Sequence, residues 1–400
     1  MQSKLRLSER KTKFIWIFSE RELSQSSVFS TFHFYYYSLS HNKKPPFCVY
    51  NYTIAITFLR SSKPFFFPLV YYLSYLFFGT AYMTTIYLGR EAASPQPCVA
   101  TIGFFDGVHR GHQFLMAQVL SDARKHAMAS TVVTFDRHPR EVLGSNFQPQ
   151  LLTTLDEKLM LMEKTGVEQT VILPFSEQMA SLSAHDFMQR VMVEKLNVRR
   201  LVIGYDNRFG HNREECFDDY VRYGRELGVE VVQAEAFPMS GVNVSSSMVR
   251  SFLMAGETEM AGRCLGYPYF VQGRVVSGQQ EGRRLGFPTA NIEPDSPRKL
   301  IPAPGVYAVK VHVGADPRVC PETLNGMMNI GTRPTFDGHQ QTLEVHIFQF
   351  DGNLYGDRIL VSFHRRIREE RRFENPSQLK QQLKRDALQA QAILNKDFDI

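Results

Sequence analysis

One stretch of fifteen residues, 98–112, constrains the fold of this chain more than any other. Its first part, Val99 to Phe105, is a short apolar run typical of a buried β-strand. Asp106 and Gly107 then predict a turn, and from His109 onward the apolar residues recur at helical spacing. The sequence therefore predicts a strand that leads through a glycine-containing turn into a helix.

This strand–turn–helix predicts an anion site. The backbone N–H groups of the helix start point into the turn, and the helix dipole is positive at that end. Three glycines, which lack a Cβ, allow a phosphate to approach the backbone closely: Gly103, Gly107 and Gly111. His109 and His112 lie on one face of the helix start and can donate hydrogen bonds to phosphate oxygens.

Two other interpretations of the histidine pair are open. A metal pair is disfavoured because no third Cys, His or Asp ligand stands at a recognisable spacing in the sequence. Ordinary surface histidines are disfavoured by the strand, glycine and helix context. Anion binding is the interpretation that uses the whole motif.

The net charge of +6 is unevenly distributed along the 400 residues. Residues 1–82 hold ten Lys and Arg and three Glu, whereas the remaining 318 residues hold 36 basic and 37 acidic side chains. Because the body is nearly neutral, we expect no nucleic-acid partner. The five cysteines, at positions 48, 98, 216, 264 and 320, form no CxxC motif, which favours a reducing cytosol over a disulfide framework.

Residues 1–82 differ in composition from the rest of the chain, since they hold 22 of the 49 aromatic residues. Three interpretations compete: a membrane anchor over 64–82, a folded aromatic domain, and translation of an AT-rich upstream region with Met83 as the true start. The anchor has nearly the ~20 apolar residues that a membrane span needs. The lack of any helical or strand period favours the third. We therefore expect residues 1–82 to be a dispensable extension without a clear fold, and the membrane to play no part.

From residue 83 to residue 266 the chain alternates between strand-like and helix-like segments. After the first strand we expect strands at 129–135, 169–174, 199–204 and 230–234, and helices at 155–164, 184–196 and 220–227. This alternation predicts a doubly wound α/β domain with a parallel sheet, in which ligands bind beyond the carboxyl ends of the strands. Polar clusters that can converge there are His109 with His112, Asp136 with His138, Asp206 with Arg208, and Ser245 to Ser247 with Arg250.

Four motifs in this part resemble those of the bifunctional riboflavin kinase/FMN adenylyltransferase family, the prokaryotic FAD synthetases. They are residues 103–112, which carry the H-x-G-H signature of nucleotidyltransferases, and residues 134–139, 204–210 and 245–250. Four positions depart from the family pattern, with Phe104 in place of Asn, Arg137 in place of Pro, Asn207 in place of Phe and Met248 in place of Arg.

The resemblance implies a Rossmann-like FMN adenylyltransferase domain over residues 83–266. It assigns catalysis to His109, His112 and Arg250, which orient two anionic reactants and neutralise charge as the FMN phosphate attacks the α-phosphorus of ATP. It implies nucleotide contacts from Gly103, Asp106, Gly107, Gly111, His138, Asp206, Ser246 and Ser247. Taken alone, Ser245 to Ser247 favour a helix cap over a phosphate site.

After Tyr269 the pattern changes to short strands separated by glycine-rich turns. We expect strands at 270–276, 305–313, 327–330, 342–350 and 359–363, and no helix until Pro376 to Asn395. This pattern predicts an antiparallel β-barrel. The C-terminal helix carries an apolar stripe of Leu379, Leu383, Ala387, Ala390 and Leu394. The resemblance implies that residues 267–400 are a riboflavin kinase domain.

The second strong motif runs from Gly282 to Asn291. Thr289 and Asn291 are two residues apart on an extended segment, so both point the same way and offer the oxygen ligands that Mg²⁺ prefers. Pro288 to Asn291 resembles the Pro-Thr-Ala-Asn motif of riboflavin kinases, which implies Mg²⁺ and ATP at this site. The sequence contains no Walker-type loop, which excludes a P-loop kinase.

Glu344 lies in an alternating strand, where a lone acid is usually a solvent-facing residue. The resemblance implies that it is the general base that activates the ribityl 5′-hydroxyl for attack on the γ-phosphate of ATP. It also implies that Arg368 contacts the flavin. We therefore expect a cytoplasmic enzyme that uses ATP and Mg²⁺ to convert riboflavin into FMN and FMN into FAD; the sequence leaves its oligomeric state open.

Two rival functions remain in view. A transferase with the same signature could act on pantetheine phosphate, nicotinamide mononucleotide or a choline-type phosphate, but the barrel and residues 288–291 argue against it. A membrane-tethered flavin-binding module without catalysis would not need Glu344 beside Thr289 and Asn291.

Overall fold

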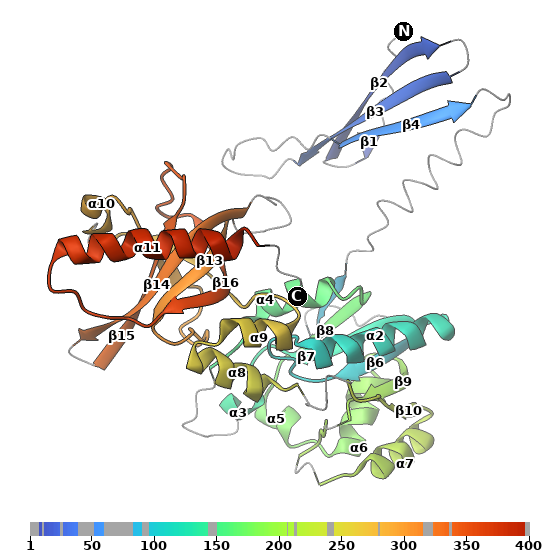
Figure 1. Cartoon of the computed structure of the whole chain (residues 1–400). Coiled ribbons are helices and arrows are strands. Elements are labelled where there is room, and N and C mark those ends of the chain that lie inside the picture. The colour runs from blue at the N-terminus through green and yellow to red at the C-terminus, as the bar shows by residue number, and fades with distance from the viewer. Residues whose placement is uncertain are drawn as a thin grey trace. The chain divides into compact units, whose positions relative to one another are not determined.

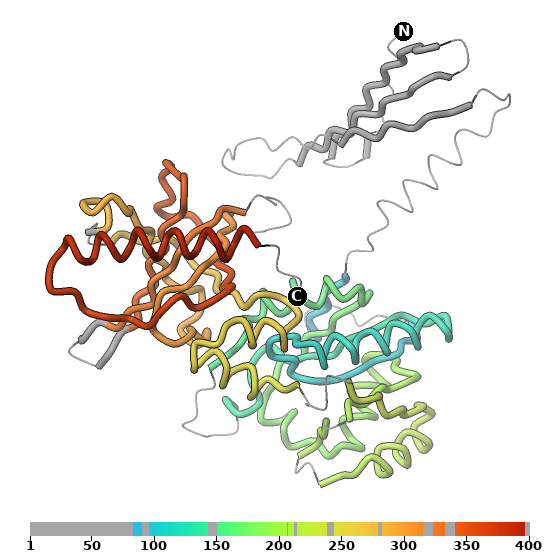
Figure 2. Tube along the Cα trace, in the orientation of Figure 1, coloured from blue at the N-terminus to red at the C-terminus, as the bar shows by residue number. Residues whose placement is uncertain are grey.

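The computed structural model describes residues 83–89, 96–142, 150–205, 207–211, 214–237, 244–278, 281–314, 323–335 and 338–396, and only backbone strands before residue 83 (Figures 1 and 2). The chain divides into two compact units, Met1–Thr80 and Ala81–Ile400, each described by itself. In the first, β1 (Ser8–Glu9), β2 (Thr12–Ser24), β3 (Ser27–Ser38) and β4 (Tyr52–Leu59) pair antiparallel in that order. The interpretations offered for residues 1–82 otherwise fall outside the described residues and stay predictions.

A six-stranded sheet lies at the centre of the α/β part of the second unit (Figure 1). Its strands are β5 (Thr84–Tyr87), β6 (Cys98–Ile102), β7 (Ala129–Phe135), β8 (Gln169–Leu173), β9 (Val198–Ile203) and β10 (Glu230–Gln233). They run in the order β10-β9-β6-β7-β8-β5, and every neighbouring pair is parallel. The predicted parallel α/β fold is confirmed.

Helices follow the strands and complete this part of the fold. They are α2 (Arg110–Lys125), α3 (Pro139–Val142), α4 (Leu155–Glu163), α5 (Glu177–Ala180), α6 (Ala184–Phe187), the π-helix η1 (Met188–Val193), α7 (Phe217–Leu227), α8 (Ser246–Ala255) and α9 (Thr258–Leu265).

The sheet buries both of its faces. Alternate side chains of β6 point to opposite sides, so that Val99 packs with Met116 of α2 and Met162 of α4, whereas Ile102 packs with Met188 of η1. All five residues of β6 are buried. A strand buried on both faces is apolar throughout rather than alternating, which explains why the sequence shows a continuous apolar run there.

Three expectations about these elements need correction. The first sheet strand in chain order is β5, which the sequence analysis missed because only Ile86 of its four residues is buried. The strand expected over Val99 to Phe105 ends at Ile102, since the last three residues belong to the turn. The helix expected at 184–196 is one turn of α-helix followed by the π-helix η1.

The second part of this unit is a closed six-stranded antiparallel barrel, which confirms the predicted barrel and adds a strand over 290–294 that was not among the five expected ones. Its strands are β11 (Phe270–Val276), β12 (Ala290–Pro294), β13 (Gly305–Val313), β14 (Thr323–Thr335), β15 (Gly338–Ile347) and β16 (Arg358–Arg368). They close in the order β11-β12-β15-β14-β13-β16. The short helix α10 (Glu281–Leu285) corrects the expectation that no helix precedes the C-terminal one.

Helix α11 (Pro376–Leu394) covers the barrel beside β13 (Figure 1). It begins where predicted, because the Asn375 side chain accepts a hydrogen bond from the Gln378 N–H and Pro376 occupies the first turn. Ala390 and Leu394 of the predicted stripe pack with Ala308 and Met327.

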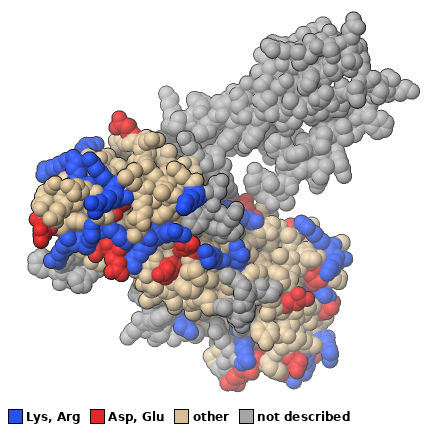
Figure 3. All heavy atoms as spheres, viewed as in Figure 1, with Lys and Arg blue, Asp and Glu red and all other residues tan. Residues whose placement is uncertain are grey.

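No helix among the described residues has the length and apolar character needed to cross a membrane. On the face drawn in Figure 3, Lys and Arg side chains are interspersed with Asp and Glu. This mixture agrees with the nearly neutral balance of residues 83–400. The proposed division into domains at residues 266 and 267 stays a prediction.

Two helical glycines give a matched test of packing against helix propensity. A Cβ on Gly224 of α7 would lie 2.5 Å from the Val229 carbonyl oxygen, whereas one on Gly262 of α9 would lie 3.6 Å from the nearest atom, an ordinary contact. We expect Gly224→Ala to lower the free energy of unfolding by about 1–3 kcal/mol through overpacking. Gly262→Ala should raise it by up to about 1 kcal/mol, because alanine favours a helix. Urea titration measures both, and stabilisation by both variants would contradict the packing.

Candidate functional site

His109 begins helix α2. Its Nδ1 accepts a hydrogen bond from the His112 N–H at 3.4 Å, as a capping side chain does. A neutral His109 whose Nδ1 accepts carries its proton on Nε2, so this nitrogen is a donor. The rings of His109 and His112 stack with centroids 3.6 Å apart and planes 20° apart. The structure therefore brings the two predicted imidazoles together at the positive end of a helix dipole.

His112 is held in its neutral form. Burial lowers its pKa well below 6.5, and repulsion by His109, when that ring is protonated, and by the Lys158 ammonium lowers it further. The ring also meets Phe105 edge-on, with centroids 5.2 Å apart. Its Nδ1 is buried without a hydrogen-bond partner among the described residues. A neutral ring presents one N–H donor, so His112 can bind an anion without bringing a charge of its own.

The Asp106 side chain points into the protein and not toward solvent, since the residue is 3% exposed. Its carboxylate accepts hydrogen bonds from the backbone N–H groups of Leu152 and Thr153, both at 3.0 Å, and from the Thr153 hydroxyl at 3.2 Å. Arg250 of α8 adds an ion pair at 2.5 Å. Both carboxylate oxygens therefore have partners inside the protein, and the nucleotide contact expected of Asp106 stays a prediction.

Gly107 is fixed next to this carboxylate. Its N–H donates to the Thr153 hydroxyl at 3.1 Å, and its carbonyl accepts a hydrogen bond from the Tyr267 hydroxyl at 2.5 Å. Its φ of +78° lies in the region that glycine adopts readily. A Cβ there would come within 2.8 Å of Leu152, so the turn has no space for a side chain.

The other two glycines of the turn make room for the protein's own rings. A Cβ on Gly103 would lie 2.8 Å from the Phe105 ring, and one on Gly111 would lie 3.2 Å from the His109 ring. The close approach that we ascribed to a phosphate is therefore also required by the packing of these aromatic side chains.

The serines and Arg250 lie at the start of α8, next to the turn. The Ser245 hydroxyl caps the helix by accepting a hydrogen bond from the Met248 N–H at 3.3 Å, which is the helix cap that the serines taken alone predicted. Ser246 donates to the Asp106 carbonyl at 2.9 Å, and Ser247 is exposed. Arg250 also donates to the Gln150 carbonyl at 2.9 Å.

His138 follows β7 and meets the Phe104 ring edge-on, with centroids 4.7 Å apart. Its pKa is lowered chiefly by burial. Asp206 lies outside the described residues. Its neighbour Asn207, one of the departures from the family pattern, donates to the Ile102 carbonyl at the end of β6.

Lys158 of α4 is a buried cation that the sequence analysis missed. It is 3% exposed and donates to the carbonyls of Phe104 and Phe135 and to the Thr134 hydroxyl, at 3.0–3.1 Å. Burial lowers its pKa to about 8, against the opposing charges of Asp106 and Asp136. The signal in the sequence is its spacing: Lys158 stands three and four residues before the buried Leu161 and Met162.

In the barrel, one register brings the predicted kinase residues together. Glu344 of β15 pairs with Asn291 of β12 on one side and with Asn329 of β14 on the other. Directly paired residues have Cβ atoms about 4.5–5.5 Å apart. Thr289 precedes β12 by one residue, two positions from Asn291, so its side chain lies on the same face. Asn329 was not among the predicted site residues.

Oxygen donors dominate this second cluster. Among the described residues, no group of three or more His, Cys, Asp or Glu side chains could hold a metal ion. A divalent cation in the barrel would therefore rely on the hydroxyl of Thr289 and the amide of Asn291, a donor set that fits Mg²⁺. The same finding gives the histidine pair no third ligand of these types among the described residues.

Arg368 connects β16 to α11. Its Nε and Nη2 bind the carboxylate of Asp386 at 2.8–3.1 Å, and Asp386 is fully buried. This ion pair occupies two of the guanidinium nitrogens and fixes the C-terminal helix to the barrel. The flavin contact expected of Arg368 stays a prediction.

Comparison with known proteins agrees with this two-part arrangement. The FAD synthetase family model matches residues 91–248, and the riboflavin kinase family model matches residues 265–394. The bifunctional riboflavin kinase/FMN adenylyltransferase of Escherichia coli (strain K12) is 39% identical over 299 residues, which cover 74% of this chain and 93% of that protein. The enzyme of the same name from Bacillus subtilis (strain 168) is 35% identical, with coverage of 73% and 91%.

The crystal structure of a macrolide-efflux protein from Streptococcus pneumoniae has a similar fold. Its TM-score is 0.71 at 30% identity, over 78% of this chain and 99% of that one. The two family models and the length of the sequence matches place both parts of the fold in one family. The chain therefore belongs to the bifunctional riboflavin kinase/FMN adenylyltransferase family.

Proposed function

We propose that this chain makes FMN from riboflavin and ATP in its barrel, and FAD from FMN and a second ATP at the turn that carries His109 and His112. One observation supports this most directly. The helix start at His109 lies in the part that the FAD synthetase model matches, and Glu344, which pairs with Asn291 and Asn329, lies in the part that the riboflavin kinase model matches. Incubation of the full chain with riboflavin, ATP and Mg²⁺, followed by chromatography of the flavins, tests it.

In adenylyl transfer, a phosphate oxygen of FMN forms a bond to the α-phosphorus of ATP, and the bond to the β-phosphate breaks to release pyrophosphate. The reaction needs no protein nucleophile. The imidazoles of His109 and His112 donate N–H groups to the phosphate oxygens, where negative charge concentrates in the transition state. The N-terminus of α2 adds its dipole, and Arg250 supplies a positive charge at the edge of the same turn.

In riboflavin phosphorylation, the carboxylate of Glu344 accepts the proton of the ribityl 5′-hydroxyl while its oxygen attacks the γ-phosphorus and ADP leaves. Thr289 and Asn291 would hold Mg²⁺, which neutralises charge on the phosphates when bound. Strands on both sides of Glu344 keep it in place.

The chain is proposed to act in the cytoplasm on small molecules. The described cysteines Cys98, Cys216 and Cys264 are free thiols, which suits a reducing compartment.

Replacement of the proposed base should separate the two activities. Glu344→Gln keeps the shape of the side chain and removes its ability to accept the proton, so we expect riboflavin phosphorylation to fall by about 10²–10⁴-fold. Adenylylation of supplied FMN should change less than twofold. Glu293→Gln on the adjacent strand β12, an exposed position, is the matched control. Equal loss of both activities in the Glu344 variant would contradict the two-site assignment.

Loss of the proposed phosphate donor should block the second reaction only. With His112→Ala we expect FAD formation to fall by about 10²–10³-fold, while FMN accumulates when riboflavin is the substrate. His126→Ala, at the other end of the same helix, should leave both rates unchanged because His126 bonds only near the helix end. An unchanged FAD yield in the His112 variant would remove that residue from the mechanism.

If Asn291 is a metal ligand, its replacement should change how the rate of riboflavin phosphorylation depends on Mg²⁺ concentration. Asn291→Ala removes one oxygen donor, so we expect the Mg²⁺ concentration for half-maximal riboflavin phosphorylation to rise by about tenfold, a typical cost of weakening a metal site. The Mg²⁺ dependence of FMN adenylylation in the same protein serves as the internal control. A lower maximal rate with an unchanged Mg²⁺ requirement would assign Asn291 another role.

A further inference from the structure

A segment before barrel strand β13 lies against a loop of the α/β part. Leu151 and Lys299 form an isolated parallel β-bridge. The Leu151 N–H donates to the Arg298 carbonyl, and the Leu300 N–H donates to the Leu151 carbonyl, both at 2.8 Å. The backbone of the barrel therefore supports the loop that runs into α4.

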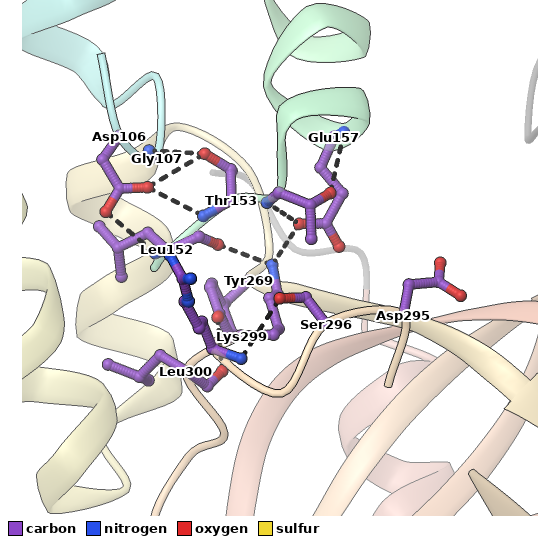
Figure 4. Close-up of polar contacts among 12 residues, drawn as sticks. Asp106, Gly107, Leu152, Thr153, Glu157, Tyr269, Asp295, Ser296, Lys299 and Leu300 are labelled. Carbon is purple, nitrogen blue, oxygen red and sulfur yellow. Dashed lines mark hydrogen bonds and ion pairs between the residues drawn. The ribbon is translucent and has the colours of Figure 1, made fainter. Parts of the chain in front are cut away.

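Lys299 extends this contact with a buried charge (Figure 4). Lys299 is 4% exposed, and its Nζ donates hydrogen bonds to the Leu152 carbonyl and to the Glu157 carboxylate, both at 2.6 Å. The ammonium also lies 4.6 Å from the centre of the Tyr269 ring. Glu157 is 1% exposed and accepts from the Thr154 N–H at 2.8 Å as half of a capping box.

The same loop holds the turn of the adenylyltransferase site. Leu152 and Thr153 donate to the two carboxylate oxygens of Asp106, and the Thr153 hydroxyl accepts from the Gly107 N–H. Gly107 stands two residues before the helix cap His109. A continuous set of hydrogen bonds therefore runs from a barrel lysine, through the loop, to the turn that places the imidazoles (Figure 4).

We propose that Lys299, although it belongs to the kinase barrel, is a positioning residue for adenylyl transfer. It acts by fixing Leu152 and Glu157, which in turn fix Asp106 and Gly107. This inference rests on the proposed function of the His109 turn. It makes the geometry of one active site depend on a side chain of the other domain.

A purely stabilising role is the alternative. A buried lysine beside a buried glutamate is costly to break, because removal of one partner leaves an uncompensated charge. Such a role predicts that both activities follow the fraction of folded protein. A positioning role predicts that adenylyl transfer falls alone, because a shift of about 1 Å at reacting groups can cost about 10²-fold in rate.

The experiment compares the full chain with Lys299→Met and with Lys299→Met/Glu157→Gln, which removes both charges and so avoids the unpaired carboxylate. In both variants we expect kcat for FMN adenylylation to fall by about 10–100-fold, with a smaller change in KM for ATP. Riboflavin phosphorylation should stay within twofold. Arg358→Met is the matched control, because Arg358 forms a partly exposed ion pair with Asp295 at the same end of the barrel.

Hydrogen exchange supplies a readout that is independent of activity. Peptides covering residues 104–112 should exchange faster in both Lys299 variants than in the Arg358 variant. Unchanged exchange there would overturn the proposal, as would full adenylylation in the double variant or a parallel loss of both activities. If the unmodified chain forms no FAD from FMN and ATP, the proposed function fails, and the exchange result alone decides the role of Lys299.

Discussion

The buried carboxylate of Asp106 forms the interactions on which the turn between β6 and α2 depends. Its partners come from sequence positions 46, 47 and 144 residues away, yet all of them converge on one side chain. A charged group can be buried only when donors satisfy it. The loop before α4 and the start of α8 are therefore held where the carboxylate needs them, and the turn between β6 and α2 is held with them.

Buried cations complete the electrostatic setting of this turn. Lys158 lies beneath the ends of β6 and β7, and Lys299 lies beside Glu157. The positive charge of Lys158 adds to burial in lowering the pKa of His112 and so disfavours protonation of that ring. In the proposed site, an anionic ligand would therefore meet the N–H of a neutral His112, and the nearby positive charge of Lys158 is buried.

Much of this architecture could be predicted from the sequence because it rests on local patterns. Strands buried on both faces are continuous apolar runs, and Ser245 and Asn375 mark helix starts by their own chemistry. The rest depends on distant partners. No local pattern shows that Asp106 is turned inward, that Arg368 pairs with Asp386, or that Glu344 lies between Asn291 and Asn329. Strand β5 was missed because four residues with one buried side chain carry too little pattern. Lys158 was missed because its partners, the carbonyls of Phe104 and Phe135 and the Thr134 hydroxyl, come from distant strand ends.

The two nitrogens of the His109 ring differ in their tasks: Nδ1 caps α2, and Nε2 is the proposed donor to phosphate. Because Nδ1 caps α2, the imidazole cannot swing away from the turn without fraying the first turn of that helix. Its orientation is thus tied to a sixteen-residue helix packed on the sheet and not to a loop. Loss of this cap costs about 1 kcal/mol, so heat that frays the first turn of α2 also releases the orientation of the imidazole.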